Sequence, residues 1–338
     1  MDQKDEIIDI ALATYNGENY LKEQIDSILN QTYNNIQIII SDDCSQDKTR
    51  EILEAYANNP KIKIYYQEHN LGYIKKFEFL LQHVEHKLYM LADQDDVWLP
   101  EKIEKTLKKM QEEQADLVFT DLEIVDENLE TVSKSFNRTM NKIQKIQKTL
   151  KTNQFEYLYN NITGCTILSK KKYIEKILPF PKNSKYVIHD SWIGLIMSFQ
   201  GKIAYLDEPT ILYRQHTNNQ VGTEKQSYKA QKFNKIRTLF IEVKQDLFKV
   251  YTENESKFPE DLQILNKKGK AYFEEIANTK NVSFKNWGTF HKLYKNEKVS
   301  YYVLNFIILN MPILGRMLFI IRKTITKICK KNKKEETC

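Results

Sequence analysis

Short apolar runs alternate with amphipathic helical patterns at a steady interval along the first 125 residues of this 338-residue chain. Strand-like runs are expected at residues 7–14, 36–40, 62–66, 87–92 and 117–120. Helical spacing of apolar residues is expected between them, at residues 20–30, 48–57, 74–84 and 100–114. Pro100 suits the first turn of the last of these helices. The repetition predicts an α/β fold with a mostly parallel sheet covered by helices on both faces.

The second half of the chain changes character twice. Residues 130–160 are polar and rich in Lys, Asn and Gln, which indicates a mobile loop or a surface helix over the ligand site. Ordered patterning returns at Gly164 and predicts a strand at 165–168, helices at 171–177 and 189–200, and an extended segment at 203–213. From residue 224 the pattern is helical without further strand runs. We therefore expect one α/β domain at 1–223 and a helical C-terminal region at 224–338.

Four polar clusters each follow one of the first four predicted strands. They are the segments 14–16, 42–43, 70–72 and 93–96. Because ligands bind outside the carboxyl ends of parallel strands, where the connecting loops converge, these clusters are expected to meet at one edge of the sheet. Composition alone would not bring four independent clusters to the same edge.

The acidic run Asp93-Gln94-Asp95-Asp96 has the spacing of a divalent-metal site. Mg²⁺ prefers a few carboxylate oxygens together with substrate phosphates, and such an ion would neutralise charge on a diphosphate leaving group. The alternative is a solvated turn or a helix cap, because Asp96 precedes Pro100 and acidic residues favour helix starts.

The pair Asp42-Asp43 also lies between a strand and a helix. One carboxylate is expected to cap that helix, an ordinary role for Asp. The other, Asp43, is expected to face the cleft and to accept hydrogen bonds from a ribose or from the edge of a base.

Composition and charge exclude several classes of protein. Apolar residues make up 41% and aromatic residues 12% of the chain, as in ordinary globular proteins. The net charge of +6 does not predict nucleic-acid binding, because the lysines cluster at the C-terminus beside an apolar segment and no recognition helix or aromatic-interleaved sheet accompanies them. The four cysteines lack the paired spacing of a zinc site or a disulfide framework, and the acidic N-terminus lacks the features of a signal peptide. A cytoplasmic location is therefore predicted.

The C-terminal segment 299–334 combines apolar and basic residues. Its apolar pieces at 301–309 and 311–321 are each shorter than the 20 or so residues that a membrane-spanning helix needs. Seven Lys and Arg residues follow between 322 and 334, so the segment is predicted to lie on the cytoplasmic surface of the cell membrane as a peripheral contact. The alternative is a set of core helices in a small bundle or an oligomer interface, with a solvated basic tail.

The polar clusters together resemble a known enzyme family. The segments Thr14-Tyr15-Asn16-Gly17, Ser41-Asp42-Asp43-Cys44-Ser45, Asn70-Leu71-Gly72 and 92–98 are similar, in order and spacing, to the signatures of family 2 glycosyltransferases of GT-A fold. The resemblance covers roughly residues 7–220. Within that family, the run Asp-Gln-Asp-Asp-Val-Trp-Leu-Pro at 93–100 resembles bacterial rhamnosyltransferases that build cell-surface polysaccharide.

This resemblance implies a substrate, a cofactor and a set of roles. The donor would be a dTDP- or UDP-linked sugar, with L-rhamnose suggested by analogy, and the acceptor a glycan, a lipid-linked glycan or a protein. Transfer would be inverting and would use Mn²⁺ or Mg²⁺. The metal ligands would be Asp95 and Asp96. The donor-binding residues would be Thr14, Tyr15, Asn16, Glu18, Asp43, Gly72 and Asp93.

The resemblance also implies an acidic residue, at the start of a later helix, that deprotonates the acceptor hydroxyl. The sequence offers Asp190 in His189-Asp190-Ser191-Trp192, with His189 where the family commonly has an acid. The alternative for Asp190 is the N-cap of its helix. His216 would complete the metal shell or contact the diphosphate, against the alternative of a structural or exposed histidine. Arg214 would contact a donor phosphate, against the alternative of a surface charge.

Two residues depart from the family pattern. Cys44 replaces the glycine usual after the second aspartate, where positive φ is expected. Phe77 stands where many relatives carry a small or amide residue, which bears on the donor pocket.

Two other classes of function compete with glycosyl transfer. Nucleotidyl transfer usually needs a glycine-rich phosphate loop with a lysine after the first strand, whereas residues 14–18 contain one glycine and no lysine. A catalytically inactive nucleotide-sugar-binding scaffold is disfavoured because Asp93, Asp95, Asp96 and Asp190 are all present. The sequence therefore predicts an active glycosyltransferase.

Overall fold

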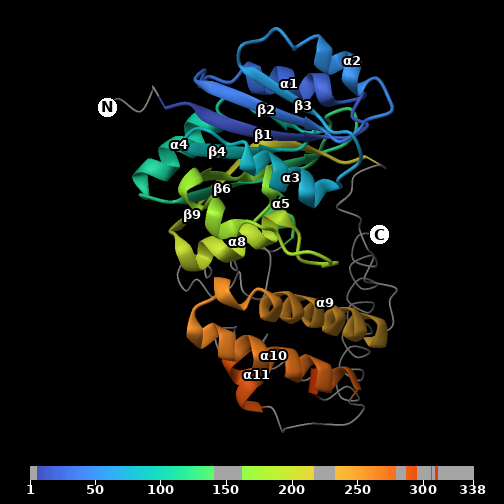
Figure 1. Cartoon of the computed structure of the whole chain (residues 1–338), viewed down its shortest axis with the longest axis vertical. Helices are drawn as coiled ribbons and strands as arrows, with labels where there is room; N and C mark the ends of the chain where they lie inside the picture. Colours follow the sequence, from blue (N-terminus) through green and yellow to red (C-terminus); the bar gives the residue numbers. More distant parts are fainter. Residues whose placement is uncertain are drawn as a thin grey trace, which may run out of the picture. The chain divides into compact units, whose positions relative to one another are not determined.

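The computed structural model describes residues 6–140, 162–216, 233–278 and 287–294, together with Phe306, Leu309 and Asn310. The chain divides into two compact units. The first comprises residues 1–182 and 188–223, and the second comprises residues 183–187 and 224–338 (Figure 1). The short segment 183–187 thus belongs to the second unit although it lies within the sequence of the first.

The first unit contains a nine-stranded sheet in the order β3-β2-β1-β4-β8-β6-β9-β5, with β7 paired to β6. β3, β2, β1 and β4 are parallel neighbours, and β6 is parallel to β9. β8 runs antiparallel to both β4 and β6, and β5 runs antiparallel to β9. The strands are β1 (Ile8–Thr14), β2 (Ile36–Asp42), β3 (Ile62–Tyr66), β4 (Leu88–Ala92), β5 (Val97–Trp98), β6 (Leu117–Val125), β7 (Thr131–Ser133), β8 (Leu168–Lys170) and β9 (Ile203–Arg214).

Helices cover the two faces of this sheet. Every residue of β1 is buried, as is typical of a parallel strand enclosed between two helical layers. The side chains of Ile8, Ile10 and Leu12 pack in one core with α1, α2 and α4, while α3 contacts β1 outside that core. Figure 1 shows α1 and α2 on one side of the strands and α3 and α8 on the other. The helices are α1 (Leu21–Leu29), α2 (Thr49–Glu54), α3 (Tyr73–Gln82), α4 (Lys102–Glu112), α5 (Phe136–Thr139), α7 (Ile174–Ile177) and α8 (His189–Gln200).

The predicted α/β fold with a mostly parallel sheet is confirmed, and three local predictions need correction. The expected strand at 165–168 is a 3₁₀ turn, η2 (Gly164–Thr166), followed by β8. The two-residue strand β5 was not predicted, because a run this short carries no periodicity. Within the polar region 130–160, residues 131–139 form β7 and α5, and residues 141–160 lie outside the described part of the chain.

The second unit is helical where it is described. It contains α9 (Phe233–Glu253), α10 (Glu260–Asn278) and α11 (Trp287–Tyr294), with a 3₁₀ turn, η4 (Glu255–Lys257), between the first two. Phe248 of α9 stacks on Phe273 of α10 with ring centroids 5.4 Å apart. Gly269 makes this approach possible, since a Cβ there would lie 2.4 Å from the Phe248 ring. Close packing of aromatic rings therefore joins α9 and α10.

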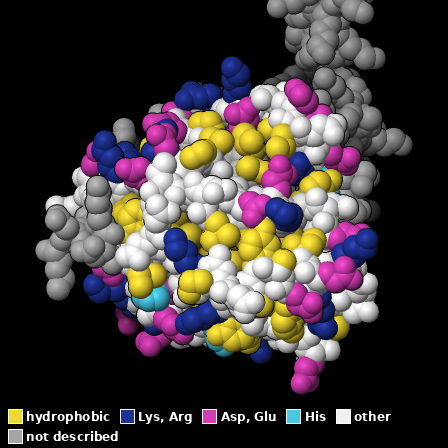
Figure 2. Space-filling model, turned by 90° about the horizontal axis from the view of Figure 1, so that it is seen from above, with side chains coloured by type: hydrophobic (Ala, Val, Ile, Leu, Met, Phe, Trp, Pro, Cys, Tyr) yellow, Lys and Arg dark blue, Asp and Glu magenta, His cyan; other side chains and the backbone are white. Residues whose placement is uncertain are grey.

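None of the helices within the described residues combines the length and the apolar character needed to cross a membrane. The predicted membrane-surface segment 299–334 lies outside the described residues, apart from Phe306, Leu309 and Asn310. On the face seen in Figure 2, Lys and Arg side chains are mixed with Asp and Glu side chains.

Candidate functional site

Strand register brings the polar segments to one edge of the sheet. Thr14, the last residue of β1, pairs with Asp42, the last residue of β2. On the other side of β1, Leu12 pairs with Ala92, so the acidic run begins at the same edge one residue later. The segment 70–72 follows β3, whose last residue pairs with Asp42. The residues that the sequence singled out in four separate loops are thus neighbours in the fold.

The loop after β1 is fixed to the loop after β2 by reciprocal hydrogen bonds. Asn16, which has a φ of 49°, donates its backbone N–H to Ser45 Oγ at 2.9 Å and accepts from Gln46 N on Oδ1 at 2.9 Å. Glu18 Oε2 accepts from Lys48 N at 3.1 Å, just before α2 begins. Asn16 and Glu18 therefore shape the loop through these contacts.

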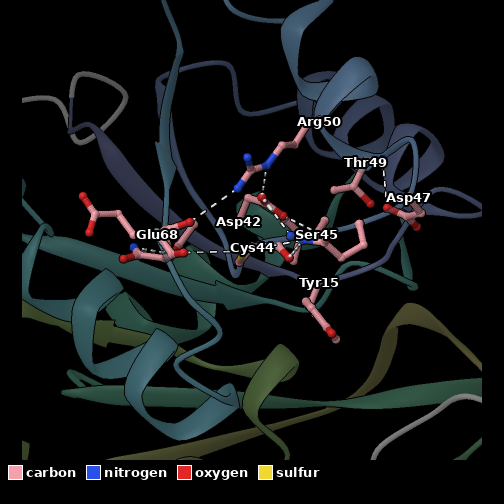
Figure 3. Close-up of polar contacts among 12 residues, drawn as sticks. Tyr15, Asp42, Cys44, Ser45, Asp47, Thr49, Arg50 and Glu68 are labelled. Atoms are coloured by element: carbon pink, nitrogen blue, oxygen red, sulfur yellow. Dashed lines mark hydrogen bonds and ion pairs between the residues drawn. The ribbon is translucent and has the colours of Figure 1, made fainter.

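The ring of Tyr15 has a different orientation from its neighbours. In Figure 3 it points away from the cluster formed by Asp42, Ser45 and Arg50. Lys76 lies 5.9 Å from the Tyr15 ring centroid. Of the residues in this loop, Tyr15 thus offers an aromatic face beside a cation.

The two aspartates after β2 have separate tasks. Asp42 is buried, forms an ion pair of 2.9 Å with Arg50, and accepts hydrogen bonds from Ser45 (Figure 3). Asp43 accepts from Leu71 N at 2.6 Å on one oxygen and from Gly72 N at 3.0 Å on the other. Asp43 therefore holds the loop after β3, and only 1% of its surface is exposed.

Two turns in this region have positive φ. Gly72 has a φ of 79°, in the range that favours glycine. Cys44 has a φ of 65°, so the residue that replaces the family glycine keeps the expected left-handed backbone. The Cys44 Sγ atom lies 3.7 Å from the Glu68 carbonyl oxygen (Figure 3).

Sequence reasoning missed two side chains that connect these loops. The Gln94 amide accepts from Thr14 Oγ1 and from Tyr15 N, each at 2.7 Å, and donates to the Tyr15 carbonyl at 3.0 Å. Lys76 of α3 donates to the Thr14 carbonyl at 2.9 Å and lies 3.7 Å from Asp43 Oδ2. Burial lowers the pKa of Lys76, while the charges of Asp43, Asp42 and Asp93 oppose that shift. No sequence signal distinguishes Lys76, because Lys75 beside it would be equally plausible on an amphipathic helix.

The three predicted metal ligands separate into two groups. His216 Nε2 lies 2.8 Å from Asp95 Oδ2, and the His216 ring packs against Tyr20 with centroids 4.9 Å apart. Asp96 is fully buried and lies instead with Asp93 and Cys165, their ligand atoms all within 4.8 Å of one another. The assignment of Asp96 to one metal shell with Asp95 and His216 therefore stays a prediction.

The interior group containing Asp96 includes a thiol, which is a poor ligand for a hard cation. Burial raises the pKa of Asp96 and of the Cys165 thiol well above their ordinary values, and neighbouring acidic charges add to both shifts. A protonated thiol does not suit Mg²⁺ or Mn²⁺, which prefer oxygen ligands. Lys102 lies behind this group, where it donates to the Cys165 carbonyl at 3.1 Å. Burial lowers the pKa of Lys102 to about 8.

Arg214 contacts the backbone of the acidic run. Its Nε atom donates to the Asp95 carbonyl at 3.0 Å, its Nη1 atom donates to the Glu127 carbonyl at 2.8 Å, and its Nη2 atom pairs with Glu23. The guanidinium also lies over the Tyr20 ring, 4.5 Å from its centroid. These contacts favour a positioning role for Arg214 over the predicted phosphate contact. Glu23 and Tyr20, both missed by sequence reasoning, bring α1 to the site.

Asp190 lies in the first turn of α8 and is not its N-cap. Ile188 occupies the N-cap position, where its backbone N–H donates to Ser191 Oγ at 3.0 Å. The capping alternative for Asp190 is therefore wrong. Gly164 packs against this turn: a Cβ there would lie 3.0 Å from His189 Nε2 and 3.4 Å from Asp190 Cβ.

The charge of Asp190 acts on the acidic run. Burial raises the pKa of Asp93, and the charges of Asp95 and Asp190 raise it further. Burial lowers the pKa of His189, which stacks on Phe77 with ring centroids 4.2 Å apart. Burial thus favours the neutral form of His189, the residue before Asp190, and Phe77 packs against its ring. The arrangement combines a carboxylate, Asp190, with a separate acid–imidazole pair, Asp95 and His216.

Comparisons with known proteins agree with this geometry. Residues 9–178 match the sequence profile described as "Glycosyl transferase family 2". The dTDP-rhamnosyl transferase RfbG of Shigella flexneri is 29% identical over 313 residues, which cover 89% of this chain and 100% of the relative.

Two solved structures share the fold. TarS of S. aureus in complex with UDP-GlcNAc has a TM-score of 0.54 and 18% identity, and the match covers 90% of this chain and 81% of that one. The mannosyltransferase PcManGT of Pyrobaculum calidifontis, in complex with GDP-Man and Mn²⁺, has a TM-score of 0.50 and 14% identity, with 96% and 88% covered. The structural likeness shows the GT-A fold that the sequence motifs predicted.

Proposed function

Because this chain belongs to glycosyl transferase family 2 and is a glycosyltransferase with a nucleotide-sugar donor, we propose that it transfers L-rhamnose from dTDP-rhamnose. The support for this sugar is the match to a dTDP-rhamnosyl transferase along that relative's whole length. UDP-linked hexoses are the second choice of donor. The product would be a glycan or a lipid-linked glycan of the cell surface.

The nucleotide would bind at the carboxyl edge of β1, β2 and β4. The ring of Tyr15 would contact the base. The hydrogen bond from Gly72 to Asp43 would hold the loop after β3 beside the nucleotide. Thr14, Asn16 and Glu18 would act chiefly through the backbone that they fix. Asp93, partly exposed at the end of β4, would approach the ribose or the sugar.

A divalent cation, Mn²⁺ or Mg²⁺, would be held by Asp95 and His216. These residues offer an oxygen and a nitrogen 2.8 Å apart, and both atom types are ligands for such ions. When bound, the ion would neutralise charge on the departing diphosphate. Arg214 donates a hydrogen bond to the Asp95 carbonyl and would thereby hold Asp95 in place beside His216.

The bond to the acceptor would form with inversion. The Asp190 carboxylate would take the proton from an acceptor hydroxyl as its oxygen attacks the anomeric carbon. The bond from that carbon to the diphosphate oxygen breaks, and its electron pair leaves with the diphosphate. The observation that supports this assignment is the electrostatic effect of Asp190, in the first turn of α8, on Asp93 of the acidic run.

The acceptor is proposed to be carried at the cytoplasmic face of the cell membrane. The support is the sequence of residues 299–334, in which interrupted apolar pieces precede a run of lysines. Sedimentation of the full chain with anionic vesicles, compared with neutral ones, would test this placement. Equal recovery with both vesicle types would contradict it.

A panel of nucleotide sugars tests the reaction. We expect release of dTDP from dTDP-rhamnose in the presence of Mn²⁺ or Mg²⁺, with loss of the activity on addition of EDTA. Release from UDP-linked donors alone would contradict the rhamnose assignment. Silence of the folded protein across the panel would contradict catalysis and favour an inactive nucleotide-sugar-binding scaffold.

A further inference from the structure

The turn that leads into the helix carrying Asp190 is held by a carboxylate from α9. Asp246 Oδ2 accepts hydrogen bonds from Ser184 Oγ at 2.6 Å, from Tyr186 N at 3.0 Å and from Lys185 N at 3.1 Å. Three donors within three consecutive residues therefore converge on one oxygen. These contacts account for the membership of residues 183–187 in the helical unit.

The series of hydrogen bonds continues from this turn into α8. Ser184 Oγ, which donates to Asp246, accepts from Val187 N at 2.8 Å. The next residue, Ile188, donates its N–H to Ser191 Oγ at 3.0 Å and accepts from the same hydroxyl on its carbonyl at 2.9 Å. The path from Asp246 to the first turn of α8 thus passes through successive residues without interruption.

The conformation of this turn depends strongly on Asp246. Residues 184–187 lie outside helices and strands, so their backbone N–H groups lack the partners that regular structure supplies. Removing the acceptor would leave two backbone donors and one hydroxyl to find water, at a cost in free energy for each. This destabilisation would affect the residues immediately before Ile188, which itself lies two positions before Asp190.

We propose that Asp246 is a positioning residue for glycosyl transfer, which orders residues 184–187 and thereby sets the placement of Asp190. This inference rests on the proposed role of Asp190 as the base. A base must approach the hydroxyl within hydrogen-bond reach, and a displacement of about 1 Å can lower the rate about 100-fold. Asp246 acts through the turn and touches neither donor nor acceptor.

The experiment compares Asp246→Ala with the wild-type full chain. The probe is dTDP-rhamnose, or the panel donor that the wild type hydrolyses fastest, with water as the acceptor. We expect kcat to fall about 10- to 100-fold while KM for the donor and Kd for dTDP stay within about twofold. Amide hydrogen exchange at residues 185–188 should rise in the same variant, without any change in α4.

Two matched variants separate positioning from general destabilisation. Asp246→Asn keeps an oxygen that accepts hydrogen bonds, so it should restore most of the rate. Glu253→Ala removes an exposed carboxylate from the same helix and should leave kcat unchanged. If Asp246→Ala fails to fold, the comparison of Asp246→Asn with Glu253→Gln, by rate and by amide exchange, takes its place.

Several results would overturn the proposal. They are a wild-type kcat in Asp246→Ala, an equal loss in Glu253→Ala, unchanged exchange at 185–188, or loss of dTDP binding together with rate. Inactivity of the wild type towards every donor would instead overturn the proposed function. Amide exchange needs no substrate, so it would still decide whether Asp246 orders the turn.

Discussion

Gln94 pairs with the backbone of Tyr15 in both directions: Tyr15 N donates to Oε1 at 2.7 Å, and Nε2 donates to the Tyr15 carbonyl at 3.0 Å. Gln94→Glu removes the donor half of this pair and places a charge against a carbonyl. We expect unfolding free energy to fall by about 1–2 kcal/mol and affinity for dTDP to fall several-fold. Calorimetric titration with dTDP and urea unfolding would measure both. An unchanged Kd would show that the pair does not shape the nucleotide site.

Asp190→Asn is expected to separate donor binding from transfer. Asparagine keeps the size of the side chain but cannot take a proton from the acceptor, so kcat should fall about 100-fold or more. Binding of dTDP should persist, because Asp190 belongs to α8 and not to the loops after β1 and β2. Rapid-quench rates together with dTDP titration would check this. A normal transfer rate in the variant would rule out Asp190 as the base.

Asp95→Asn and His216→Ala are expected to weaken metal and donor together. Each removes one member of the pair that is 2.8 Å apart, so the concentration of Mn²⁺ needed for half-maximal activity should rise at least about 10-fold. Asp96→Asn tests the separation of the interior group and should leave this concentration within about threefold. An equal shift in all three variants would restore Asp96 to the metal shell.

Arg214→Lys is expected to destabilise the protein although the charge is kept. Lysine cannot reach the Asp95 carbonyl, the Glu127 carbonyl and Glu23 together, so about 1–3 kcal/mol of unfolding free energy should be lost. The matched control is Arg138→Lys, whose side chain is 61% exposed and pairs with Asp207. That change should cost less than about 1 kcal/mol. Equal effects in urea unfolding would argue against a positioning role for Arg214.

Asp116 is expected to give the fold a specific sensitivity to acid. Partial burial would raise its pKa, but hydrogen bonds from Lys202 N and Lys170 outweigh burial and lower the pKa to about 2, from an ordinary 3.8. Because the folded-state pKa is the lower one, the stabilisation is present above pH 3.8 and is lost as pH falls towards 2. In Asp116→Asn, unfolding free energy should be about 1–2 kcal/mol lower at pH 6, with the difference shrinking between pH 4 and 2.

Urea unfolding at several pH values would measure this difference. Glu112→Gln, at an exposed position of α4, serves as the control and should differ little from the wild type at every pH. A constant difference between Asp116→Asn and the wild type down to pH 2 would contradict the assigned shift.

The sheet and the edge at which the loops meet could be predicted from sequence, because buried parallel strands produce continuous apolar runs. Leu88 to Ala92 is such a run, and Ile8 to Leu12 is one that only Asp9 interrupts; the polar residues that follow these strands necessarily lie at one edge. The antiparallel strand β8 was misplaced because Gly164 starts a turn that the apolar residues after it conceal.

The contacts between side chains could not be predicted in the same way. Lys76, Glu23 and Tyr20 come from helices whose spacing shows which face is buried but not what a polar residue at its margin will meet. The spacing of the acidic run does not show that Asp96 lies with Asp93 and Cys165 while Asp95 contacts His216, because these contacts depend on the local backbone. Contacts between residues more than 100 positions apart in the sequence, such as that of Asp95 with His216, depend on the whole fold.

Because residues 183–187 belong to the second, helical unit, they limit where recombination between related genes can join two halves of such enzymes. A recombination event at residue 224 would combine a new C-terminal half with the turn at residues 184–187. That turn donates hydrogen bonds to a carboxylate of α9. If the new C-terminal half has no acidic residue at the position of Asp246, the chimera keeps the α/β half intact. The turn before Asp190 then lacks the carboxylate that holds it. Successful chimeras should therefore keep this turn and its carboxylate as one inherited pair.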